Sequence, residues 1–93
     1  MLSDIPKKLE KVSKEKIDME ILRAGMIAEL DAINLYEQLA ARAQDKKVKA
    51  ILLDIAREEK THTAEFQTLL LQKDKEQVEE MEKGKREVEE LSE

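Results

Sequence analysis

Three residues of this 93-residue chain could together bind a metal ion. Glu29 lies in one long amphipathic segment, and Glu59 and His62 form a Glu-x-x-His pair in the next. A four-helix bundle that binds two metal ions between carboxylates needs a glutamate from each of two helices and a Glu-x-x-His pair from each of two more. The chain supplies one of each, so we predict that a second copy completes a four-helix bundle and the site.

The residues around these candidate ligands follow helical spacing. Two stripes repeat every three or four positions, as in helices packed along their length. The stripes are Leu22, Met26, Glu29, Ile33, Tyr36, Ala40 and Ala43, then Val48, Leu52, Ile55, Glu59, His62, Phe66 and Leu69. Because the link around Gln44 and Asp45 is short, the two helices are predicted to form an antiparallel hairpin.

The same spacing places the candidate ligands at one level of the hairpin. Glu29 lies about 15 residues before the turn and Glu59 about 15 after it, roughly 22 Å along each helix axis. Charged groups on an apolar stripe are costly without a partner. That cost favours a metal site over the alternative, in which Glu59 and His62 are an exposed pair on a charged helix.

The ligand types indicate which metals the site would take. Oxygen ligands with imidazole suit iron, although zinc, cobalt or manganese would also bind, and calcium could occupy the carboxylates. We expect Glu59 to bridge two ions, with Glu29 and His62 as terminal ligands. Tyr36 lies two turns after Glu29, about 10 Å along the axis, and its side chain leans toward that level. Its hydroxyl either supports a ligand carboxylate by a hydrogen bond or finds another polar partner in the core.

Composition indicates an all-α, single-domain protein. Charged residues make up 42% of the chain and hydrophobic residues 41%, with two Gly, one Phe and no Cys. That profile is too poor in turn formers and aromatics for a β-fold, and it excludes disulfides and thiolate metal sites. A net charge of −5 argues against nucleic acid as a partner, and no apolar run approaches a membrane span. We therefore expect a cytoplasmic protein.

Helix boundaries follow from capping signals. Ser13 or Asp18 is the predicted N-cap of the first helix and Asp45 that of the second, while Asp74 and Gln77 form a capping box for the third. The predicted organisation is a loose lead-in over 1–13 and one domain over 14–93, with helices at about 14–43, 46–73 and 75–91.

The first helix also carries a second apolar stripe, so it is predicted to be buried on two sides. The stripe is Ile21, Gly25, Ala28, Ala32, Leu35 and Leu39. Two covers are open: another subunit, whose backbone could approach closely over Gly25, Ala28 and Ala32, or the third helix folded back.

Two runs of sequence resemble the encapsulated ferritins, and more distantly the rubrerythrin and ferritin-like di-iron proteins. They are Ala28-Glu29-Leu30-Asp31-Ala32-Ile33-Asn34-Leu35-Tyr36 and Ala56-Arg57-Glu58-Glu59-Lys60-Thr61-His62. The resemblance implies a ferritin-like two-helix subunit with an appended C-terminal helix. It also implies that Glu29, Glu59 and His62 from two subunits build one ferroxidase centre, and that the dimers form a ring, usually a decamer.

The implied activity is oxidation of Fe(II) to Fe(III), for iron storage and detoxification inside an encapsulin nanocompartment, with the shell protein as partner. Asp31 matches an acidic residue on the route by which metal enters, while Leu35 stands where the family often has an aromatic residue. No shell-targeting peptide is recognisable after Leu91, so a cut shell fusion and an unfamiliar targeting signal both stay open. The alternatives are a rubrerythrin-like peroxide reductase and a non-catalytic assembly module clipped together by metal.

Overall fold

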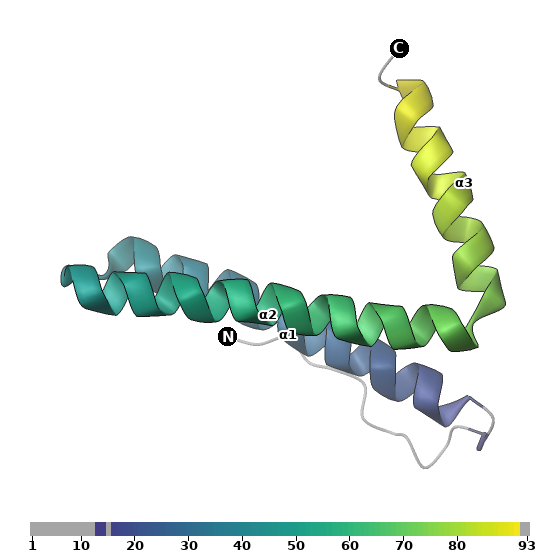
Figure 1. Cartoon of the computed structure of the whole chain (residues 1–93), viewed down its shortest axis with the longest axis horizontal. Helices are drawn as coiled ribbons and strands as arrows, with labels where there is room; N and C mark the ends of the chain where they lie inside the picture. Colours follow the sequence, from purple (N-terminus) through teal and green to yellow (C-terminus); the bar gives the residue numbers. More distant parts are fainter. Residues whose placement is uncertain (1–12, 15, 92–93) are drawn as a thin grey trace.

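The computed structural model describes residues 13–14 and 16–91, which form three α-helices: α1 (Ile17–Arg42), α2 (Lys46–Lys73) and α3 (Lys75–Leu91). Helices α1 and α2 lie side by side as an antiparallel hairpin, and α3 leaves the end of α2 in a different direction (Figure 1). The molecule is flat, measuring 47 × 45 × 19 Å. The all-α hairpin with a C-terminal helix is therefore confirmed.

Helix α1 begins later than predicted, and neither predicted residue caps it. Its N-cap is Lys16, which makes no side-chain capping hydrogen bond. Ser13 contributes only its backbone carbonyl, which accepts from the Lys16 amide at 3.1 Å, and Asp18 already lies in the first helical turn. The predicted N-cap was wrong because an acidic residue inside the first turn also favours a helix start, through the helix dipole. The predicted lead-in falls mostly on residues 1–12, outside the described residues.

The turn between α1 and α2 is confirmed as predicted. Ala43 is extended and ends α1, and the Asp45 side chain accepts hydrogen bonds from the amides of Lys47 at 2.8 Å and Val48 at 3.0 Å. These amides are among the first of α2, which have no partner within the helix. An aspartate at the N-cap is a preferred way to satisfy them.

Asp74 alone separates α2 from α3. Its amide donates to the carbonyl of Leu70 at 2.9 Å, and its side chain accepts from the Gln77 amide at 3.0 Å. The aspartate half of the predicted capping box is therefore present. The glutamine half is absent. The Gln77 side chain would have accepted from the Asp74 amide, but that amide donates to the Leu70 carbonyl at the end of α2.

The core is thin and lies between α1 and α2. Its buried apolar members among the described residues are Leu22, Ile33, Ala40, Ala56 and Leu70. Gly25 also serves this contact: a Cβ placed on it would lie 3.0 Å from the Phe66 ring of α2. The interpretation of Gly25 as a residue that lets a partner backbone approach was therefore wrong, since its missing side chain makes room for Phe66 within the hairpin.

Large apolar side chains stay exposed on both flanks of the hairpin. On one flank of α1, Ile21 and Leu39 of the predicted second stripe are exposed. Helix α3 begins against the other flank, where its Met81 lines a cavity with Ile27 and Leu30. Successive residues of an α-helix are rotated by about 100° around its axis. By this spacing Ile27 and Leu30 lie on the flank of α1 opposite to Ile21 and Leu39. The third helix therefore does not fold over the second stripe.

None of the helices formed by the described residues is long and apolar enough to cross a membrane.

Candidate metal centre

The three candidate ligands converge across the hairpin. Glu29 of α1 and both Glu59 and His62 of α2 each offer one ligand atom, and these atoms lie within 4.8 Å of one another. His62 Nδ1 is 3.6 Å from Glu29 Oε2 and 3.7 Å from Glu59 Oε2. The i,i+3 spacing puts Glu59 and His62 on one helix face, and the antiparallel packing of α1 brings Glu29 to the same level.

Both carboxylates are mostly buried, and one of their oxygens has no partner. The Glu29 and Glu59 side chains are only 18% and 19% exposed, and Glu29 Oε2 is buried without a hydrogen bond. Its 3.6 Å separation from His62 Nδ1 exceeds hydrogen-bonding distance. A buried polar atom without a partner costs free energy, and a bound cation would supply the partner.

The separations also suit a shared ion. Two ligand atoms each about 2.1 Å from one metal ion lie roughly 3.0 Å apart when at right angles and about 4.2 Å apart when opposite. The separations of His62 Nδ1 from Glu29 Oε2 and Glu59 Oε2, 3.6 and 3.7 Å, fall between these limits. Two carboxylates and one imidazole form a donor set that first-row divalent metals, iron included, accept. The residues therefore fit a metal ion.

One side of this group opens onto a surface of the hairpin. The His62 side chain is 46% exposed. Leu69, one heptad further along α2, and Ile51, on the same flank by helical spacing, are both exposed. Two carboxylates with an imidazole therefore sit beside an apolar surface, which is an arrangement that a second protein surface could cover.

The remaining predicted site residues lie outside this group of ligands. Tyr36 is partly buried and shares the Glu29 face of α1 by its heptad spacing, but in the described part of the chain no hydrogen bond joins its hydroxyl to the three ligands. Asp31, two residues after Glu29, projects from a different side of α1. Their roles, as support for a ligand and as part of the route by which metal enters, stay predictions.

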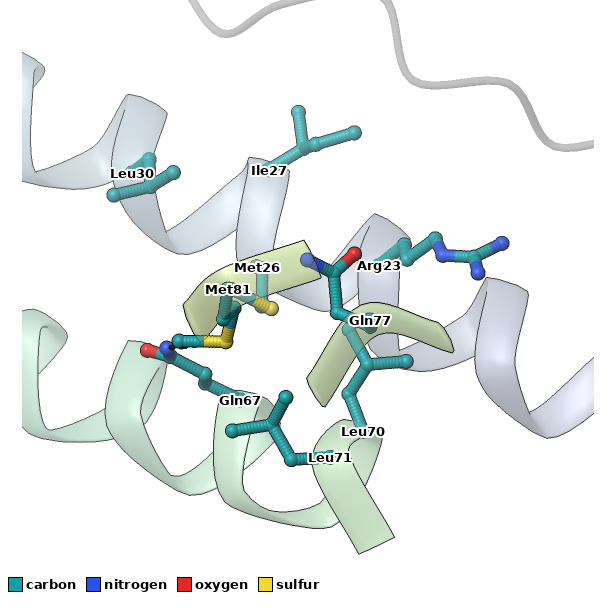
Figure 2. Close-up of a pocket in the computed structure, with 9 residues that line it drawn as sticks. All are labelled: Arg23, Met26, Ile27, Leu30, Gln67, Leu70, Leu71, Gln77 and Met81. Atoms are coloured by element: carbon teal, nitrogen blue, oxygen red, sulfur yellow. Dashed lines mark hydrogen bonds between the residues drawn. The ribbon is translucent and has the colours of Figure 1, made fainter. Parts of the chain in front are cut away.

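A separate cavity of about 460 Å³ lies at the corner where the three helices meet (Figure 2). Among the described residues, Arg23 is the only ionisable one that lines it, and none of the three candidate ligands does. The lining residues are Arg23, Met26, Ile27, Leu30, Gln67, Leu70, Leu71, Gln77 and Met81. Because this cavity holds no set of metal-binding or nucleophilic groups, the carboxylate and imidazole group is the candidate functional site.

Comparisons with known proteins agree on one relationship. The EncFtn-like family model matches residues 4–87. A ferritin-like–encapsulin shell fusion protein of Pyrococcus furiosus is 59% identical over 80 residues, which cover 86% of this chain and 23% of that protein. The chain therefore spans about a quarter of the length of this relative.

A solved structure extends the comparison to the fold. The crystal structure of the encapsulated ferritin domain from Pyrococcus furiosus is similar with a TM-score of 0.83 and 57% identity, over 87% of this chain and 83% of that one. The match of the family model over most of the sequence, together with this shared fold, shows that the chain belongs to the EncFtn-like family of encapsulated ferritins.

Proposed function

We propose that the chain is a ferroxidase, which oxidises Fe(II) to Fe(III) at a di-iron centre formed between two copies. The observation that carries the proposal is the open group of Glu29, Glu59 and His62, with a buried carboxylate oxygen that has no partner. Membership of a ferritin-like family supports iron as the metal.

The second copy follows from ligand number and from the surface around the site. Three ligands from one chain are too few for two ions, whereas two copies bring four carboxylates and two imidazoles. The four negative charges would balance two Fe(II) ions. A contact on this flank would also bury Leu69 and Ile51, which are exposed in the single chain. We propose a homodimer as the functional unit and, by analogy with the resembling family, a decameric ring of dimers.

Each residue has a distinct task in this centre. Glu59, which shares one helix face with His62, would be held in common by the two ions, while Glu29 and His62 would each bind one ion. Fe(II) is the substrate: two Fe(II) ions would each give one electron to one dioxygen molecule, which would take up two protons and leave as hydrogen peroxide. The carboxylates favour the ferric product, because the interaction of anionic oxygens with a cation strengthens as its charge rises. Tyr36 would hold a ligand carboxylate by a hydrogen bond, and Asp31 would attract metal on its way in.

The cellular setting is proposed from the relative. That protein is named as a fusion of a ferritin-like part to an encapsulin shell. We propose that this chain likewise works inside an encapsulin nanocompartment in the cytoplasm, with the shell protein as its partner. A hairpin of this size encloses no storage volume, so ferric mineral would accumulate in the shell.

Oxidation of added iron tests the activity. Chelator-treated protein receives two Fe(II) per dimer without oxygen, and oxygen is then admitted while ferric absorbance and oxygen consumption are recorded. We expect both to rise well above the rate of iron in buffer. Faster oxidation by peroxide than by oxygen would indicate a peroxide reductase instead. Tight Fe(II) binding without turnover by either oxidant would indicate a non-catalytic module.

A further inference from the structure

An ion pair joins the first helix to the corner between the other two. Arg23 of α1 lies 2.7 Å from the Oδ2 atom of Asp74, 51 residues further along the chain. The Asp74 side chain is only 14% exposed, and that of Arg23 is 48% exposed. The pair is therefore a charge-assisted hydrogen bond that is partly shielded from water.

The same aspartate holds the backbone of both neighbouring helices. Its amide ends α2 on the Leu70 carbonyl, and its Oδ1 atom caps α3 on the Gln77 amide. The hydrogen bond from the Gln77 amide and the Arg23 guanidinium lower the pKa of Asp74, against the opposing effect of burial. One ionised side chain thus connects all three helices.

Close packing does little else to fix the direction of α3. Between its first turns and the hairpin lies the corner cavity of about 460 Å³, with Met81 on one wall and Ile27 and Leu30 on another (Figure 2). These three apolar side chains are exposed. Among the residues that line this cavity, Gln67 of α2 makes a weak contact with α3, from its side-chain amide to the Met81 sulfur at 3.9 Å.

We propose that the Arg23–Asp74 pair is a latch that keeps this corner open and fixes the direction in which α3 leaves the hairpin. Closing the cavity would bury Met81 against Ile27 and Leu30, a contact that the hydrophobic effect favours. The latch opposes that closure because the Asp74 carboxylate holds the first turn of α3 through the Gln77 amide and holds α1 through Arg23. Without it, α3 turns about Asp74 toward the hairpin.

Two spin labels can follow this movement, because the chain has no cysteine. Gln38→Cys on α1 and Glu90→Cys on α3 place labels at exposed positions. Residue 90 approaches residue 38 when α3 closes toward the hairpin, so closure shortens the distance. Doubly labelled protein is assembled with an excess of unlabelled protein, and pulsed dipolar spectroscopy then records distances within one chain.

Two variants separate the latch from the cap. Asp74→Asn removes the charge but retains an oxygen that accepts from the Gln77 amide, and Arg23→Gln leaves Asp74 intact. We expect each to raise the population of short distances roughly two- to fivefold, the range typical of one surface ion pair. The double variant should add little to either single one, because both remove the same interaction.

A matched control and a test on the native chain make the outcome decisive. Arg57→Gln breaks an exposed pair with Asp54, 3.5 Å apart and away from the corner, and should leave the distances unchanged. The proposal is overturned if Arg23→Gln and Asp74→Asn both retain the native distances, or if the control shifts equally. If both variants lose helicity by circular dichroism, the native chain in 1 M salt decides: a shift to short distances supports the latch, and unchanged distances overturn it.

Discussion

Among single residues, Glu29 gives the strongest support for the proposed metal site, through its Oε2 atom. This atom is buried and makes no hydrogen bond, although a carboxylate in a folded protein normally finds donors for its oxygens. The nearest nitrogen, His62 Nδ1, is 3.6 Å away, too far for a hydrogen bond but suitable for an ion held between the two. A role as a metal ligand would explain why this oxygen is buried without a hydrogen-bond partner.

Substitution of any one ligand should therefore abolish most of the proposed activity. Glu29→Ala, Glu59→Ala and His62→Ala each delete two ligands from a two-fold centre. We expect each to lower the initial rate of Fe(II) oxidation by at least the roughly 10- to 100-fold that loss of a residue supporting a metal ligand costs. Helicity should persist, since alanine is the best helix former. Stopped-flow ferric absorbance at saturating iron measures the rate.

Glu58→Ala is the control for this series. Glu58 is exposed and lies next to Glu59, but it is not one of the converging ligands. Its substitution removes the same charge from the same helix and should leave the rate near that of the native chain. A native rate for Glu59→Ala would show that iron is oxidised elsewhere.

Among the helices, α1 and α3 each contain one glycine, the first closely packed and the second facing open space. A Cβ on Gly25 of α1 would meet the Phe66 ring at 3.0 Å, whereas a Cβ on Gly84 of α3 would meet nothing within 4 Å. Both pay the conformational entropy of glycine in a helix. Only at Gly25 does packing offset this cost, because the Phe66 ring occupies the space where a side chain would lie.

Alanine substitution should separate the two glycines. Gly84→Ala should stabilise α3 by about 0.5–1 kcal/mol, seen as increased helicity and a shallower loss of ellipticity on heating. Gly25→Ala gains the same propensity but crowds Phe66, at a cost of about 1–3 kcal/mol, so the hairpin should melt at a lower temperature. Thermal melts of both variants, with metal removed, make the comparison. A stabilising Gly25→Ala would contradict the close contact.

For the assembled protein, we expect metal binding and the association of subunits to be one process. The chain holds one half of the proposed centre, and the apolar surface beside it is exposed. Without metal, facing carboxylates from two copies repel each other. Because the proposed centre has its full set of ligands only when both halves meet, metal should bind more tightly to the dimer, and the difference in binding free energy becomes assembly free energy.

Metal should therefore shift chelator-treated protein from small species toward the dimer or ring. Cobalt(II) or zinc(II) can replace iron here, because neither is oxidised by air in such a site. At a metal concentration of about 100 times Kd the gain is about 2.7 kcal/mol, enough to change the distribution measured by sedimentation velocity. Glu59→Ala should respond much less. Identical distributions with and without metal in the native chain would show that the site and the assembly are independent.

The three helices and the shared level of the three candidate ligands could be predicted from patterns of residues close together in the chain. Helical periodicity and the Asp45 cap depend on residues a few positions apart, so a local pattern was enough to predict the hairpin and to align Glu29 with Glu59 and His62. It failed at the start of α1, where Lys16 is the N-cap, because several nearby residues favour a helix start equally well.

Contacts between residues far apart in the chain were visible only in the folded structure. Gly25 contacts Phe66, and Arg23 pairs with Asp74, across separate parts of the chain. Glu29 Oε2 is buried without a hydrogen-bond partner, and this too depends on how α1 and α2 pack. No periodicity encodes such a pair, since its partners are set by the rotation of each helix about its axis and by the angle at Asp74. Those two quantities arise from the packing of whole side chains and not from any local preference of the backbone.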